Sequence, residues 1–359
     1  MRVRCIGLTM IASMLALGSA QAEPEAGAAS SAQKAPRLFD THDALTLDLE
    51  ADWGAVRRDR KGVPAKHPAT LAYAGPSGTV SIPIQIETRG RSRLRETVCE
   101  FPPLRLDIPK EGRKGTLFRG IGELKLVTHC QRSPSYEQNL LLEYLLYRSY
   151  ALLTDQSYRV RLMQVRYFAP GGKKPLWERA GFVIEDASDL AKRLGAESVR
   201  ENVIDASQVD PALASRVEIF FYLIGMTDFS MVARPDGPCC HNARMLRPPG
   251  AALIPVPFDF DQTGVVDPEY ALPDPRLKIR SVTQRKFRGH CREPGLHDAA
   301  ISELREKRAQ ITALFEAEAK LQPARRKKAL AFLDGFFQWA SDPARVQKTL
   351  SEECRKITE

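Results

Sequence analysis

The stretch TVSIPIQIETRG, Thr79–Gly90, determines how the first half of the chain is interpreted. Apolar side chains recur at every second position from 80 to 86, which is the period of a β-strand with one buried face. Tyr158–Leu162 repeats this alternation. Gly171 and Gly172 then predict a hairpin turn into another strand through residues 182–184.

Helical patterns become frequent further along the chain. Tyr136–Leu153 carries a wide apolar stripe typical of a helix packed on a sheet. Asp210 and Pro211 are typical of a helix start, as N-cap and first helical residue. Further helices are expected over residues 299–319, 323–339 and 343–353, and a short strand over Leu253–Val256. We therefore predict an α+β fold of two lobes with a cleft between them: a strand-rich N-lobe over residues 37–187 and a mainly helical C-lobe over residues 188–359.

The N-terminal residues resemble an export signal. Residues 1–22 have a basic start, an apolar stretch over Cys5–Gly18 and small residues before Glu23, which predicts a cleaved Sec-type signal. Residues 23–36 are small and polar, as in a flexible linker. Because no later stretch approaches membrane-spanning length, we expect a periplasmic or extracellular protein with no stable membrane insertion.

Composition narrows the class of protein. The 359 residues are 43% hydrophobic and 27% charged, which excludes a disordered chain, a fibre and a membrane bundle. The formal net charge of +9 is a mild excess. It suits an anionic substrate or envelope polymer and does not call for nucleic acid as a partner.

Cysteine usage agrees with export. Six cysteines follow the predicted signal: Cys99, Cys130, Cys239, Cys240, Cys291 and Cys354. In an oxidising compartment disulfides are the expected state, and the 15 possible pairings stay open. A zinc site that includes His241 or His290 is the weaker alternative, because three consecutive side chains can hardly converge on one ion.

The segment Gly225–Gly264 contains the chemistry of interest. Asp228, Asn242, Asp259 and Asp261 all stand at the predicted ends of elements. Mg²⁺ prefers such hard oxygen ligands, with substrate phosphates completing its shell. Asp and Asn are also common in turns, but two neighbouring carboxylates repel each other unless a cation relieves them.

The order of several short motifs resembles that of the CotH (spore-coat protein H) kinase-like family. The matching positions are Arg89, Gly90 and Ser92 in ETRGRSR, Lys125 in GELKLVTH, Glu185 in GFVIED, the pair Asp228 and Asn242, and PFDFD at Pro257–Asp261. This resemblance spans about half of the chain and implies an atypical protein-kinase fold.

The resemblance also implies roles for these residues. Asp259 and Asn242 would bind Mg²⁺, with Asp261 beside them, and Asp228 would accept or orient the proton of the nucleophile. Lys125 would neutralise the phosphates of ATP or another nucleotide, held in place by Glu143 or Glu137, with Arg89 and Glu185 in the same cofactor site.

Three functions follow from these observations. The first is an exported kinase that transfers a phosphoryl group to a protein or envelope component. The second is a catalytically inactive binding or assembly protein of the cell envelope, and a metal-dependent hydrolase ranks lower because no hydrolase motif is present. Arg89, Arg91, Arg93 and Arg95 could bind phosphate, but their alternation favours a solvated strand face.

Overall fold

The computed structural model describes residues 37–199, 203–232 and 239–356. The predicted signal and linker, residues 1–36, lie outside the described residues. The described residues belong to a single compact unit, and the predicted division of the chain at residue 187 stays a prediction.

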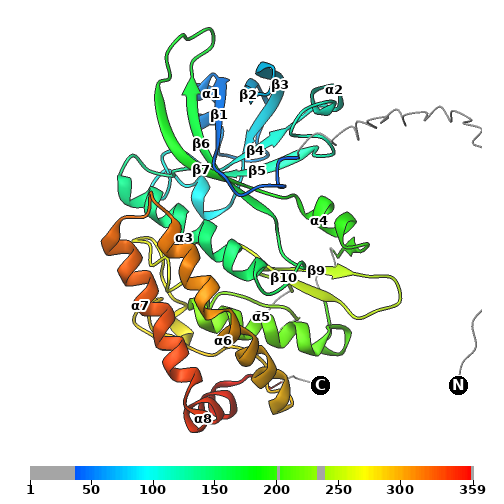
Figure 1. Ribbon diagram of the computed structural model, residues 1–359, viewed down its shortest axis with the longest axis vertical. Coiled ribbons are helices and arrows are strands. Elements are labelled where there is room, and N and C mark those ends of the chain that lie inside the picture. The colour runs from blue at the N-terminus through cyan, green and yellow to red at the C-terminus, as the bar shows by residue number, and fades with distance from the viewer. Residues whose placement is uncertain (1–36, 200–202, 233–238, 357–359) are drawn as a thin grey trace, which may run out of the picture. The chain divides into compact units, whose positions relative to one another are not determined.

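Seven strands close into a barrel in the order β1-β2-β3-β4-β5-β7-β6 (Figure 1). Their bounds are β1 Leu45–Ala51, β2 His67–Gly75, β3 Gly78–Thr88, β4 Leu104–Asp107, β5 Glu123–Val127, β6 Val160–Phe168 and β7 Trp177–Ile184. Neighbouring strands are antiparallel except for β1 and β6, which pair in parallel from Leu45 opposite Met163 to Glu50 opposite Phe168. This parallel pair closes the barrel.

The predicted two-lobed, kinase-like fold is wrong. In place of a strand-rich N-lobe and a helical C-lobe, the chain forms a closed seven-stranded barrel together with a separate small sheet. The alternating pattern of β3 shows which face of a strand is buried, but it carries no information on whether the first strand of a sheet also pairs with the last.

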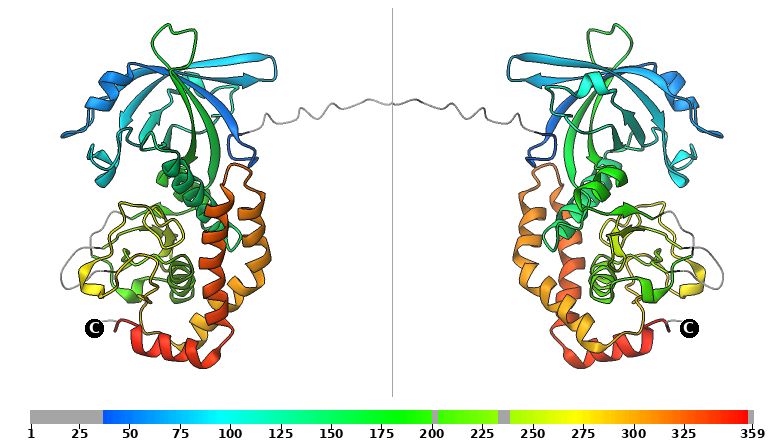
Figure 2. Two further views of the ribbon diagram at one scale, coloured as in Figure 1. Left: turned by 90° about the vertical axis from the view of Figure 1, so that its left-hand side faces the viewer. Right: turned by 90° about the vertical axis from the view of Figure 1, so that its right-hand side faces the viewer.

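The small sheet has the order β10-β9-β8. Its strands are β8 Glu197–Ser198, β9 Ala243–Arg247 and β10 Ile254–Pro257. The α-helices are α1 Trp53–Arg58, α2 Lys110–Arg113, α3 Pro134–Ala151, α4 Ala187–Arg193, α5 Pro211–Ile224, α6 Pro294–Ala317, α7 Pro323–Ala340 and α8 Pro343–Glu353, with short 3₁₀ turns η1 Ser92–Leu94, η2 Ala206–Gln208 and η3 Pro275–Leu277. Helices α6 and α7 lie side by side (Figure 2).

The predicted strands and helices are largely confirmed. The Asp210 side chain caps α5 by accepting hydrogen bonds from the backbone N–H groups of Ala212 and Leu213. Gly225 ends the same helix in the left-handed conformation at φ 72°, which glycine adopts without a Cβ clash. As a result, Asp228 lies just beyond the end of a fully capped helix.

Two hydrophobic clusters form the core. One fills the barrel and includes Leu47, Leu71, Ile84 and Leu106. The other joins α3 and α5 to the small sheet and the C-terminal helices. Helix α3 packs against β6 and β7, so residues on α3 reach the edge of the barrel.

Three disulfides join the six cysteines. The pairs are Cys99–Cys130, Cys239–Cys240 and Cys291–Cys354. They indicate an oxidising, non-cytoplasmic compartment. Among the helices described, none is long and apolar enough to span a membrane.

Candidate functional site

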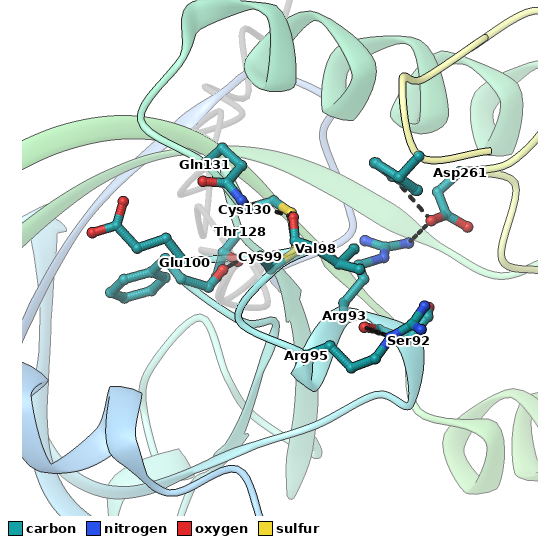
Figure 3. Close-up of a disulfide and its surroundings, with 12 residues drawn as sticks. Ser92, Arg93, Arg95, Val98, Cys99, Glu100, Thr128, Cys130, Gln131 and Asp261 are labelled. Carbon is teal, nitrogen blue, oxygen red and sulfur yellow. Dashed lines mark hydrogen bonds and ion pairs between the residues drawn. A yellow bond between two sulfur atoms is a disulfide. The ribbon is translucent and has the colours of Figure 1, made fainter.

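One guanidinium group, that of Arg93 in η1, contacts three carboxylates. Its Nη2 atom lies 3.4 Å from Glu143 Oε2, 3.3 Å from Asp259 Oδ1 and 3.1 Å from Asp261 Oδ2. Figure 3 shows the Arg93 side chain directed at Asp261. The cation that relieves the repulsion expected between Asp259 and Asp261 is therefore Arg93.

The alternating arginines at 89–95 were expected to form a solvated strand face, and Arg93 does not fit this expectation. Its side chain is only 11% exposed, and it lies in a 3₁₀ turn between β3 and β4 rather than in a strand. Alternation along the sequence could not reveal this, because Gly90, at φ 109°, precedes the turn and the strand period ends at Thr88.

Burial governs the protonation of this acidic cluster. The pKa of Glu143 is raised, first by burial and then by the charges of Asp261 and Asp259, while Arg93 lowers it. The pKa of Asp261 is raised by burial and by Asp259, against the opposing effect of Arg93. The Tyr270 hydroxyl also donates a hydrogen bond to Asp261 Oδ2 at 3.1 Å. One guanidinium therefore only partly compensates the buried acids.

Hydrogen bonds around Asn242 connect the segments that carry Asp228, Asn242 and Asp259. The Asn242 Nδ2 group donates to the Asp228 carbonyl at 2.6 Å, and the Phe258 N–H donates to the Asn242 carbonyl at 3.0 Å. Asp259 follows Phe258 directly, and its N–H donates to the Tyr147 hydroxyl at 2.9 Å. The predicted acid and amide residues are thus linked by one short chain of hydrogen bonds.

Backbone conformation distinguishes two of these residues. Asn242 and Asp259 adopt left-handed φ angles of 54° and 63°. Asn and Asp are several-fold enriched among non-glycine residues in this region, and such conformations cluster at functional sites. The Asp259 side chain is 50% exposed, so its carboxylate remains open to a ligand despite the contact with Arg93.

Asp228 has a histidine partner. Its Oδ2 atom lies 2.8 Å from His241 Nε2, and this hydrogen bond is the main cause that raises the pKa of His241. A backbone bridge between Ser230 and His241 holds His241 against the segment that carries Asp228. His241 was considered at the sequence level only as a zinc ligand, and its pairing with Asp228 was not foreseen.

Basic groups lie beside the acid and amide residues. Lys125 Nζ is 3.5 Å from Asp186 Oδ2, and the pKa of Lys125 is lowered first by burial and further by Arg89 and Arg244. Arg89 in turn feels the charge of Asp259. The Arg244 Nε atom is buried and has no hydrogen-bond partner among the described residues. Arg89, Lys125 and Arg244 form a group that we call the basic cluster, and it has more positive charge than Asp186 compensates.

The predicted cofactor residues Lys125, Glu143 and Glu185 have other partners than those expected. Glu143 contacts Arg93, whereas Lys125 pairs with Asp186, so the expected lysine–glutamate pair is not formed. Glu185 is buried in a two-point ion pair with Arg193, at 3.0 and 2.8 Å. Glu137 pairs with Arg179 at 3.2 Å. Arg244 was missed by the sequence analysis, because a single arginine in a strand carries no motif.

Asp259 and Asn242 are the candidate ligands for one Mg²⁺ held together with a phosphate. Within the described ranges no group of three or more His, Cys, Asp or Glu side chains is arranged to hold a metal ion. Asp259 still offers a half-exposed carboxylate, and Asn242, which is 7% exposed, offers an amide oxygen. Mg²⁺ is commonly bound by one or two such protein ligands plus waters and phosphates rather than by an all-protein cage.

No protein-family model matches the chain, and no curated protein matches it.

Proposed function

We propose that this protein transfers a phosphoryl group from a magnesium nucleotide, ATP or a similar nucleotide, to a protein or envelope component. One observation supports this most strongly: the half-exposed carboxylate of Asp259 lies within electrostatic range of Arg89, and Arg89 and Arg244 lie within electrostatic range of Lys125. Phosphoryl transfer depends mainly on positioning the reactants and on neutralising the charge of the phosphates. An acidic group for the metal and basic groups for the phosphates would serve these two purposes.

Each group has a role in this proposal. Asp259 and Asn242 hold Mg²⁺, which when bound supplies positive charge to the phosphate oxygens. Lys125, Arg89 and Arg244 bind the phosphates. Asp228, oriented by His241, accepts the proton of the acceptor hydroxyl.

The order of the sequence motifs is a second support. It resembles that of the CotH kinase-like family, in which the same residue types serve phosphoryl transfer. Because the lobed fold implied by that resemblance is not formed, the proposal depends on the residues of the site. In an oxidising compartment, the acceptor would be a periplasmic or extracellular one.

A catalytically inactive binding protein is the second candidate, and Arg93 favours it. Its guanidinium already supplies positive charge to Asp259 and Asp261, so the acidic cluster is partly neutralised without a metal. The basic cluster would then bind an anionic envelope component without any transfer.

Turnover of labelled ATP distinguishes the two candidates. The purified protein is incubated with Mg²⁺ and ATP labelled at the γ-phosphate, and label reaching water or protein is measured. We expect the wild type to turn over ATP, and we expect Asp228→Asn to lower the rate of label transfer by about 100-fold or more. Asp298→Asn, an exposed residue on α6, is the matched control and should keep full activity. A wild type that binds magnesium ATP without turnover would establish the binding protein instead.

A further inference from the structure

A cavity of about 300 Å³ opens beside β7, away from the basic cluster. Its walls come from α1, from the loop before β4, from the loop between β5 and α3, and from β7. The Cys99–Cys130 disulfide fastens two of these loops together; in Figure 3, Glu100 and Gln131 lie on one side of this disulfide and Arg93 on the other. The volume is at the lower end of the range for small-molecule pockets, about 300–1,000 Å³.

Aromatic rings form one wall of this cavity. Phe101 stacks on the His129 ring with centroids 4.9 Å apart and an interplanar angle of 25°. Trp177 stacks on Tyr167 at 5.4 Å and 24°, and Tyr167 meets His129 edge-on at 5.8 Å. Such a wall offers a flat, rigid surface to another ring.

Polar atoms within the aromatic wall have no partner. His129 Nδ1, the Tyr167 hydroxyl and Trp177 Nε1 are all buried and make no hydrogen bond within the described part of the chain. The neighbouring Trp53 shows the usual arrangement, since its Nε1 donates to the Phe168 carbonyl at 2.8 Å. His129 is only 5% exposed. Buried polar groups are nearly always hydrogen-bonded, so the unpartnered atoms of the two lining residues His129 and Trp177, with the fully buried Tyr167 packed behind them, indicate a missing acceptor-rich partner.

Charge at the mouth of the cavity is positive. Arg57 and Arg132 each lie 2.7 Å from Glu100 Oε1, and Arg179 lies 3.2 Å from Glu137 Oε1. Three guanidinium groups against two carboxylates leave one net positive charge. Burial, followed by the charge of Arg179, lowers the pKa of His129 to about 4, so at neutral pH the imidazole adds no charge. The arginines therefore attract a single negative charge.

We propose that this cavity binds a small monocarboxylate that carries a ring. The ring packs on the wall formed by Phe101, His129 and Trp177, while the carboxylate accepts hydrogen bonds from Trp177 Nε1 and from the arginine rim. This inference does not depend on the proposed phosphoryl transfer, because none of these side chains belongs to that site.

Benzoate is a suitable probe, and its binding is measured by isothermal titration calorimetry. We expect one molecule per chain with millimolar or tighter affinity. Benzyl alcohol, which has the same ring without the charge, should bind about tenfold more weakly, or about 1.4 kcal/mol. Equal affinity for the two compounds would refute the role of the rim.

Two variants locate the binding. Trp177→Phe keeps the ring but removes the N–H donor, and Arg179→Gln removes a rim charge; each should weaken benzoate binding about tenfold. The matched controls are Trp339→Phe on α7 and Arg166→Gln on β6, where Arg166 pairs with Asp48 of β1; both should bind as the wild type does. Circular dichroism identifies any variant that fails to fold. Failure of the folded wild type to bind millimolar benzoate, or normal binding by both pocket variants, would overturn the proposal.

Discussion

Arg93 is the residue on which the arrangement of the acidic cluster depends. It is the common partner of Glu143, Asp259 and Asp261, and two of these three acids are themselves buried. Removing one partner of a buried ion pair leaves uncompensated charge, which costs far more than the loss of a surface pair.

Arg93→Met should therefore lower the free energy of unfolding by about 3–5 kcal/mol at neutral pH. Urea denaturation measures the change, and Arg91→Met, an exposed arginine of the same segment, is the matched control with a change below about 1 kcal/mol. Similar small losses in both variants would contradict the role given to Arg93.

Glu143 predicts a pH dependence of stability. Burial raises its folded-state pKa to about 8, above the unfolded value of about 4.3. The folded chain then keeps a proton that the unfolded chain has lost, so the stability contributed by this group is complete below the unfolded pKa and is lost as the pH rises through the folded pKa.

The stability of the wild type relative to Glu143→Gln should accordingly fall between about pH 5 and pH 8, by at most about 1.4 kcal/mol per pH unit. Urea denaturation across this range tests it. Glu303→Gln, whose partner is Arg216 at the surface, should show a nearly constant difference from the wild type. A relative stability of the wild type that rises with pH would show that the carboxyl is buried in its charged form.

Residue types alone pointed to part of the candidate site. Asp228, Asn242 and Asp259 were singled out because acids and amides at the ends of elements are typical of metal and phosphate sites, and hydrogen bonds around Asn242 connect the segments that carry them. Arg93 and Arg244 were not found. An arginine has no motif of its own, and the partners of Arg93 are set by contacts between η1, α3 and the segment after β10, which are distant in sequence.

At the scale of elements, the Cys99–Cys130 disulfide fastens the segment after η1 to the loop before α3. It closes a loop with a sequence separation of 31 residues. The variant with both Cys99→Ser and Cys130→Ser should lose about 3–4 kcal/mol of unfolding free energy, because the unfolded chain is no longer constrained. Hydrogen exchange should become faster over residues 92–98. Unchanged exchange there would show that Arg93 is held without the disulfide.

The cap of α5 gives a second prediction at this scale. Asp210→Ala removes the acceptor of two backbone N–H groups and should cost about 1 kcal/mol, measured by urea denaturation. Asp210→Asn keeps an acceptor and should cost only a fraction of that. Equal losses would mean that charge rather than hydrogen bonding supplies the stabilisation.

Local sequence patterns predicted the helices and strands well, because the signals for them come from residues close together in the sequence. The Asp-Pro start of α5, the glycine turn between β6 and β7 and the alternation in β3 are all decided by neighbours in the sequence. The segment Arg91–Arg95 was misinterpreted because arginine alternation resembles a strand, whereas Gly90 allows the backbone to leave the sheet before it.

For the whole molecule, the closed barrel was beyond the reach of sequence patterns. Its closure depends on parallel pairing of β1 with β6, strands that are far apart in the sequence and have no hairpin signal between them. The two lobes were expected because most predicted strands precede most predicted helices along the chain. Such a count describes the order of elements along the chain and leaves their pairing undetermined.

The proposed function requires that Asp259 and Asn242, together with Arg89, Lys125 and Arg244, bind a magnesium nucleotide. Isothermal titration calorimetry of ATP binding, with Mg²⁺ and with EDTA, tests it most directly. We predict that Mg²⁺ tightens ATP binding to the wild type, that Asp259→Asn weakens binding in Mg²⁺ by about tenfold or more, and that Asp298→Asn changes nothing. ATP affinity that is the same with and without Mg²⁺, and the same in Asp259→Asn, would contradict the claim.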